Sequence, residues 1–173
     1  SCYWKGGVIE GTTDFIFGNG DYLFDGTTIS TLGGPITAGN HPASQEWGYV
    51  FKGCTIKAGK SGVNDGGYLL GRTWNGETRV AFIDTDMKII PAPRGWDPMT
   101  AASNTWLYEY NSTKNGAAVD LSQRFCSDSD NQTHKGTDYV LTAAQAAEYK
   151  MENIFGEVDG WYPAEEMPLI LVE

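Results

Sequence analysis

Val50-Phe51-Lys52-Gly53-Cys54-Thr55-Ile56 places an aromatic residue five positions before an aliphatic residue, with short or polar residues between them. The same pattern begins at Tyr3, Leu23 and Ala81, so the aromatic positions are 4, 24, 51 and 82. Successive copies are therefore 20, 27 and 31 residues apart. A repeat of about 20–50 residues is typical of a solenoid, in which each unit buries its apolar face only by stacking on its neighbours.

The composition of the repeats indicates a solenoid built from strands. Aromatic and β-branched residues favour strands, and 22 glycines in a chain of 173 residues fit many tight turns. We therefore predict an all-β fold, a parallel β-helix in which equivalent positions stack as ladders. The expected ladders are Trp4, Phe24, Phe51 and Phe82, and Ile9, Ile29, Ile56 and Met87. The growing spacing places the extra residues in loops at 40–47 and 59–67, where a solenoid commonly carries its binding face.

The three cysteines, Cys2, Cys54 and Cys126, have no metal-type spacing. Cys54 occupies the same repeat position as Gly7, Thr27 and Thr85, which favours a small core residue over a reactive thiol. One disulfide with one free thiol is possible, and three buried thiols are the favoured expectation.

The chain is expected to form a single domain over residues 1–173, with β-helix turns and loops in 1–136 and a capping helix and tail in 137–173. Leu141–Tyr149 reads as a helix, with Thr142 as its N-cap and Gln145 completing a capping box. The tail over 160–172 contains two prolines. We expect the helix and tail to cover an open end of the stack.

Charge limits the classes of partner. The formal net charge is −10 and the pI is about 4.5, which argues against nucleic acid and anionic membrane surfaces. No apolar run approaches the ~20 residues of a membrane span. The chain begins at Ser1 with residues that already read as a strand, which indicates a processed N-terminus or a fragment.

Asp14 is the first candidate for chemistry. It lies in the otherwise apolar, β-prone run Gly11–Gly18, where an unpaired buried charge would cost several kcal/mol. Downstream, Leu70–Trp74 carries Arg72 and Trp74 at a glycine turn. An Arg near Asp14 would hold it ionised and make it a nucleophile.

Each of these residues has a structural alternative. Asp14 could bind backbone amides at a corner of the solenoid, and Arg72 could be a solvated residue at its rim. Trp74 could belong to the core, although its polar neighbours favour an exposed platform for a sugar ring. His41 and His134 lie in polar segments without a Ser or Cys partner, so a Ser/His triad has little support. The sequence contains no zinc, calcium-loop or phosphate-loop pattern.

Gly11-Thr12-Thr13-Asp14-Phe15-Ile16-Phe17-Gly18 resembles the signature around the nucleophilic aspartate of pectin methylesterases. Leu70-Gly71-Arg72-Thr73-Trp74 resembles the LGRPW motif of the same family, with Thr in place of Pro. Further segments agree in order, so the resemblance covers nearly the whole chain: Ile36–Ala38, Gly53–Ile56, Gly95–Trp96, Glu109–Asn111 and Leu141–Thr142.

The resemblance implies a right-handed parallel β-helix and an esterase without metal or cofactor. Asp14 would attack the C6 methyl ester of a galacturonate unit of homogalacturonan and release methanol, and Arg72 would orient Asp14. Trp74 would carry the sugar ring, and Phe17 would line the same subsite. Strand alternation puts Phe17 and Asp14 on opposite faces, so this role for Phe17 requires a bend before Gly18. Pectin as substrate implies a secreted, cell-wall or periplasmic protein.

The family also uses a general acid and side-chain amides that precede the Asp14 segment. The residues before Asp14 contain no Gln and no Asp, and Glu10 is at the wrong position. The chain therefore resembles the C-terminal part of a pectin methylesterase, is expected to be inactive alone, and could pair with the N-terminal half as a separate chain. One alternative is a non-catalytic β-helix that binds acidic polysaccharide through Trp74. Another is a pectate lyase, which would need a calcium-binding acid cluster.

Overall fold

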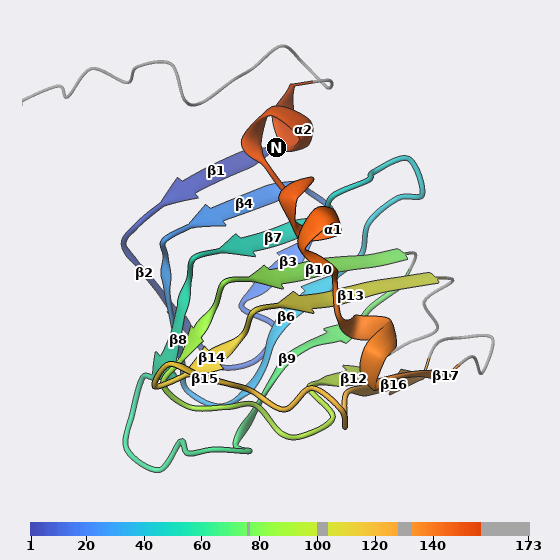
Figure 1. The fold of residues 1–173 in the computed structure, drawn as a ribbon. Helices are drawn as coiled ribbons and strands as arrows, with labels where there is room; N and C mark the ends of the chain where they lie inside the picture. The colour runs from blue at the N-terminus through green and yellow to red at the C-terminus, as the bar shows by residue number, and fades with distance from the viewer. Residues whose placement is uncertain (76, 100–103, 128–132, 157–173) are drawn as a thin grey trace, which may run out of the picture.

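The computed structural model describes residues 1–75, 77–99, 104–127 and 133–156. Over these residues the chain winds through successive coils of short strands, and each coil adds a strand to parallel sheets that run the length of the molecule (Figure 1). Sheet 1 contains β1 (Cys2–Lys5), β4 (Tyr22–Asp25), β7 (Tyr49–Lys52), β10 (Glu77–Ile83) and β13 (Asn104–Tyr110). Sheet 2 contains β2 (Val8–Gly11), β5 (Thr28–Thr31), β8 (Thr55–Ala58), β11 (Asp86–Met87) and β14 (Thr113–Lys114), with β15 (Ala117–Ala118) antiparallel at its edge. Sheet 3 contains β3 (Ile16–Gly18), β6 (Gly34–Gly39), β9 (Tyr68–Thr73) and β12 (Trp96–Pro98).

Two short antiparallel strands and three short helices follow the coils. The strands are β16 (Phe125–Ser127) and β17 (Thr133–Lys135), and the helices are η1 (Gly136–Tyr139), α1 (Ala143–Ala147) and α2 (Met151–Phe155). Because neighbouring strands within each of the first three sheets come from successive coils, the architecture is the predicted parallel β-helix.

Both predicted ladders are confirmed by the strand register. Trp4, Phe24, Phe51 and Phe82 are aligned across β1, β4, β7 and β10. The last three rings stack at centroid distances of 4.7 and 4.3 Å. Trp4 is in register but 44% exposed, because β1 has a neighbour on one side only. The aliphatic ladder from Ile9 to Met87 is aligned in the same way across sheet 2.

The aromatic column ends in a buried ion pair that the sequence pattern did not reveal. Glu109 takes the position that follows Phe82. Its carboxylate accepts hydrogen bonds from Arg124 Nε at 2.5 Å and from Ser112 Oγ at 2.8 Å, and the two charged side chains are at most 1% exposed. Arg124 Nη1 also donates to the Pro93 carbonyl at 2.9 Å. The buried ion pair therefore takes the place of an aromatic side chain at β13, the strand at which the repeat pattern ends.

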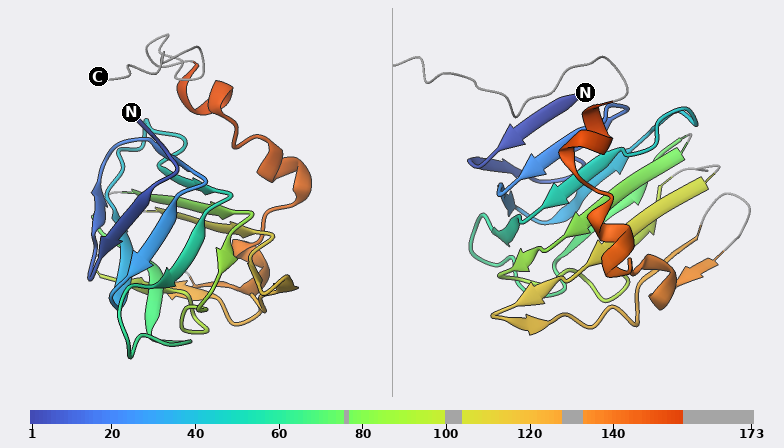
Figure 2. Two further views of the ribbon diagram at one scale, coloured as in Figure 1. Left: turned by 90° about the vertical axis from the view of Figure 1, so that its left-hand side faces the viewer. Right: turned by 45° about the horizontal axis from the view of Figure 1, so that its top comes forward.

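The C-terminal helices lie where the sequence did not place them. The predicted capping box between Thr142 and Gln145 is present at the start of α1. However, α1 and α2 run along the outer face of sheet 1 instead of covering an open end of the stack (Figure 2). The physical reason is that sheet 1 also turns apolar side chains outward, including Leu23 and Val50, and the helices bury them. The expected tail over 160–172 lies outside the described residues.

The cysteines are free thiols in the described part of the chain. Cys54 is buried in the core, as its repeat position predicts, and burial raises the pKa of its thiol to about 11. The expectation of three buried thiols is wrong for Cys2, which is exposed because β1 is an edge strand.

Candidate active site

Asp14 lies in the turn that leads from β2 into β3. Its φ is +52°, in the left-handed region, and its N–H donates to the Pro35 carbonyl at 2.8 Å. Gly34, with φ +82°, faces the same turn, and a Cβ at Gly34 would lie 2.8 Å from Thr13 Oγ1. The next coil therefore supports the turn closely, and the left-handed residue takes Asp14 out of the alternation of the following strand.

Arg72 reaches Asp14 from β9. Its Nε donates to the two carboxylate oxygens at 2.9 and 3.0 Å, and its Nη2 also binds Asp14 Oδ2. The Asp14 side chain remains 20% exposed and that of Arg72 30%, so the pair is held by the fold and open to solvent. The hydrogen bond to Asp14 and the charges of Asp14 and Asp97 raise the pKa of Arg72, while burial opposes this shift.

Sheet 3 explains how Arg72 can reach across to Asp14. Phe17, Ala38 and Arg72 occupy equivalent positions on β3, β6 and β9, so they share one face of the sheet. The small side chain of Ala38 leaves room above β6. Gly71, next to Arg72, allows β9 to approach β6, because a Cβ there would lie 2.0 Å from Thr37 Oγ1.

The predicted site residues Asp14, Phe17 and Trp74 line one pocket of about 360 Å³, together with Ala38 and Met99. Phe17 is 61% exposed and forms a wall of this pocket. The bend before Gly18 that this role of Phe17 requires is present: the left-handed residue Asp14 interrupts the alternation, and both side chains line the same pocket. Met99 was not predicted, because the segment after Trp96 follows no repeat.

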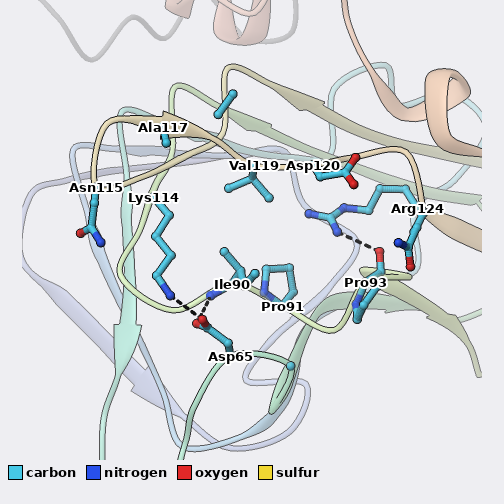
Figure 3. Close-up of a pocket in the computed structure, with 13 residues that line it drawn as sticks. Asp65, Ile90, Pro91, Pro93, Lys114, Asn115, Ala117, Val119, Asp120 and Arg124 are labelled. Carbon is cyan, nitrogen blue, oxygen red and sulfur yellow. Dashed lines mark hydrogen bonds and ion pairs between the residues drawn. The ribbon is translucent and has the colours of Figure 1, made fainter.

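A larger pocket of about 790 Å³ lies between the segments 90–93 and 114–124 (Figure 3). Lys114 is bound to Asp65 there, and Arg124 is bound to Glu109 and the Pro93 carbonyl. Both cations are therefore already neutralised or engaged by the protein, and no carboxylate in this pocket has an Arg partner that orients it toward the open space. The arrangement at Asp14 is the better candidate for nucleophilic chemistry, although its pocket is smaller.

Other classes of site find no support in the described residues. No group of three or more His, Cys, Asp or Glu side chains could hold a metal ion in that part of the chain. His41 was expected in a polar loop and is instead 1% exposed, with Tyr49 against its ring. The helices that the structure describes are too short and too polar to cross a membrane.

Comparison with known proteins agrees with the motifs. The family model described as Pectinesterase matches residues 1–157. The chain belongs to the pectinesterase family. Probable pectinesterase A of Aspergillus fumigatus is 36% identical over 126 residues, which are 70% of this chain and 38% of that protein. Putative pectinesterase 63 of Arabidopsis thaliana is 32% identical over 74% of this chain and 38% of its own length.

Solved structures of the family share the fold. Pectin methylesterase from Aspergillus niger matches with a TM-score of 0.64 and 27% identity, over 90% of this chain and 47% of that chain. PemA from Erwinia chrysanthemi matches with a TM-score of 0.60 and 22% identity, over 94% of this chain and 53% of its own. The fold is thus the right-handed parallel β-helix of these enzymes. The chain spans about two fifths of the length of the curated relatives it matches.

Proposed function

We propose that this chain is the part of a pectin methylesterase that carries its nucleophile. The observation that supports this proposal most strongly is the Asp14 carboxylate, held by Arg72 and facing a pocket between two aromatic side chains. A carboxylate fixed in this way cannot rotate away from a bound ester, and its ionised form is the nucleophilic one. We assign to Asp14, Arg72, Phe17 and Trp74 the roles that the family resemblance implies.

The reaction follows from this arrangement. One Asp14 oxygen attacks the C6 carbonyl of a methyl-esterified galacturonate unit, and the C–O bond to the methoxy group breaks. The methoxy group takes a proton from a general acid and leaves as methanol, and an acyl-enzyme anhydride remains. Water then attacks this anhydride and gives one proton back to the general acid and the other to solvent, which frees the galacturonate carboxylate and restores Asp14. Arg72 keeps Asp14 oriented through both steps.

Phe17 and Trp74 are proposed to bind the sugar next to the reacting ester. Trp74 is partly exposed at the pocket, where its indole can pack against the C–H face of a pyranose ring. The net charge of −10 disfavours a polyanionic ligand at long range, whereas an esterified segment of homogalacturonan is neutral. These features favour methyl-esterified pectin as the substrate, which implies a secreted, cell-wall or periplasmic setting.

Part of the catalytic machinery is proposed to come from outside the Asp14 pocket. The residues that line it include no amide side chain and no acid besides Asp14. The edge strands β1, β2 and β3 lie together at one end of the sheets, and Trp4 and Val8 are exposed there. An uncovered edge of this kind is a template for pairing. We infer that an N-terminal portion of the same enzyme, attached or as a separate chain, stacks on this edge and supplies the general acid and the oxyanion donors.

Methanol release from methyl-esterified pectin tests the proposal. We expect no release by the 173-residue chain alone, and release when the N-terminal portion is present in a longer chain or is added separately. Asp14→Asn keeps the shape of the side chain and should abolish release. Asp120→Asn, at an exposed acid in the larger pocket, is the matched control and should leave release unchanged.

The outcomes separate the alternatives. Release that persists in the Asp14→Asn variant would contradict the proposed nucleophile. Binding of demethylated pectin without methanol release by the assembled protein would instead favour the non-catalytic polysaccharide-binding protein. Intact mass under denaturing conditions, which would detect a companion polypeptide, is the control for the composition of each sample.

A further inference from the structure

The short segment Gly39–His41 connects the two aromatic walls of the Asp14 pocket. Its Asn40 N–H donates to the carbonyl of Gly18, the residue after Phe17, at 2.9 Å. Its Gly39 carbonyl accepts the N–H of Trp74 at 3.3 Å. The same carbonyl also accepts a hydrogen bond from the Thr78 hydroxyl at 2.9 Å. The position of this bridging segment therefore sets how the backbones behind Phe17 and Trp74 lie relative to one another.

His41 holds the bridging segment, Gly39–His41, in place on the side that faces the core. Its backbone exchanges two hydrogen bonds with Glu77, at 2.6 and 3.0 Å, and its ring is buried. The ring packs so closely under Gly39 that a Cβ on that glycine would lie 2.8 Å from His41 Cε1. Tyr49 meets the ring edge-on at 4.7 Å, and its hydroxyl donates to the same Gly18 carbonyl at 2.7 Å. The imidazole therefore packs between Gly39 and Tyr49, both of which hold backbone groups behind the Phe17 and Trp74 walls.

The hydrogen bonds require the neutral imidazole. Nδ1 accepts the backbone N–H of Arg79 at 3.2 Å, so the proton of the neutral ring is on Nε2. Nε2 itself is buried without a hydrogen-bond partner among the described residues. A second proton would sit on Nδ1 and point at the Arg79 N–H, which would replace an attraction between donor and acceptor by a repulsion between two donors.

The charged and titratable groups around the ring do not remove this constraint. Burial is the largest influence and lowers the pKa of His41, and the positive charge of Arg79 lowers it further. The Asp21 carboxylate and the backbone groups of Glu77 and Gly20 raise it, but they do not outweigh burial, and Asp21 already accepts the Gly48 N–H at 2.7 Å. Glu77 pairs with Arg79, and Tyr49 directs its hydroxyl to Gly18. The surroundings therefore favour an uncharged ring.

We propose that His41 is a positioning residue whose neutral imidazole holds the Phe17 and Trp74 walls in place, so that acid loosens the pocket. His41 does not line the pocket, and it acts through the backbone contacts of the bridging segment. The positioning itself does not depend on the reaction proposed above. Only its consequence for substrate, weaker binding of an esterified oligosaccharide in acid, rests on that proposed function.

NMR of the 173-residue chain tests this inference without substrate. The indole N–H signal of Trp74, assigned by its loss in Trp74→Phe, is followed from about pH 7 to about pH 4.5, the range in which His side chains titrate. In the unsubstituted chain we expect this signal to shift with the same midpoint as the His41 Cε1–H signal. His41→Asn keeps an acceptor near Nδ1 and cannot titrate, so its Trp74 signal should keep its neutral-pH position. His134→Asn, at the other histidine, should respond like the unsubstituted chain.

Two results would overturn the inference. One is an unchanged acid shift of Trp74 in His41→Asn, and the other is a Trp74 signal that does not follow the His41 midpoint in the unsubstituted chain. The second comparison needs no variant at position 41, so it decides the question even if His41→Asn does not fold. Titration with a methyl-esterified oligogalacturonide is kept separate: a lack of binding at every pH would contradict the proposed function and leave the NMR result standing.

Discussion

The buried ion pair between Glu109 and Arg124 leads to a prediction in which two substitutions cost less than one. Both side chains are at most 1% exposed, and Glu109 follows Phe82 in the aromatic column. Glu109→Leu would leave the guanidinium of Arg124 buried without a carboxylate, and Arg124→Met would leave the carboxylate without its cation. Removing one partner of a buried pair costs about 3–5 kcal/mol of unfolding free energy.

The double variant Glu109→Leu with Arg124→Met removes both charges and continues the apolar column. Replacing both partners by apolar residues of similar volume is often neutral or stabilising by about 1–4 kcal/mol. Here Ser112 Oγ and the Pro93 carbonyl also lose a partner, at about 1 kcal/mol for each hydrogen bond. We therefore expect the double variant to lie within about 2 kcal/mol of the unsubstituted chain, whereas the sum of the single losses is about 6–10 kcal/mol.

Urea unfolding followed by tryptophan fluorescence and far-UV circular dichroism measures these differences. In thermal unfolding of a domain of this size, each kcal/mol of unfolding free energy shifts Tm by about 2–4 °C, so each single variant should melt at least about 6 °C lower. Lys88→Ala breaks the exposed pair with Asp86 and serves as the control, with an effect of at most about 1 kcal/mol. A double variant as unstable as the sum of its parts would refute the reasoning, because it would mean that the two charges are not coupled.

Three further predictions concern the ladder, the strand spacing and acid. Phe51→Ala should cost about 3–5 kcal/mol in urea unfolding, whereas Trp4→Ala, at the exposed end of the ladder, should cost less than half as much, and equal losses would contradict the ladder as a graded core. Gly71→Ala should cost about 1–3 kcal/mol, because the new Cβ overlaps Thr37 Oγ1, and the Asp14–Arg72 signals in NMR should shift with it; an unchanged spectrum would argue against this contact. The lowered pKa of His41 means that the unfolded state takes up its proton first, so the contribution of His41 to stability is complete above about pH 6.5 and is lost as the pH falls; thermal melts of His41→Asn should lack that acid-side loss, and a matching loss in the variant would contradict it.

The fold could be predicted from the sequence because, in a solenoid, the spacing of the repeat determines which residues of neighbouring strands are aligned. The positions of Phe24, Phe51 and Phe82 follow from spacing alone, and so does the buried position of Cys54. The repeat carries no information beyond its own residues. It therefore missed Glu109, where a charged residue replaces the aromatic one, and it could not place α1 and α2, whose few apolar residues fit more than one apolar surface.

The pairing of Asp14 with Arg72 could also be predicted from the sequence. The carboxylate of Asp14 and the guanidinium of Arg72 are complementary groups, and each lies in a segment that the solenoid repeats would stack. Strand alternation failed at Asp14 because the left-handed residue interrupts the period on which the rule rests. His41 was misplaced because its flanking residues are polar, while its own ring is covered by residues distant in the chain, such as Tyr49 and Arg79.

The packing of α2 on sheet 1 has a consequence for the order in which the protein is completed. Phe155 touches Tyr3 at a ring-centroid distance of 6.4 Å, so residues made at the two ends of the described chain meet on one surface. During synthesis, the outward side of β1 stays exposed to solvent until α2 has left the ribosome. The early coils can wind as they emerge, but the contact between Tyr3 and Phe155 is available only to a chain made as far as α2. A ribosome stalled before α2 would therefore hold a chain whose Tyr3 is not yet covered by Phe155.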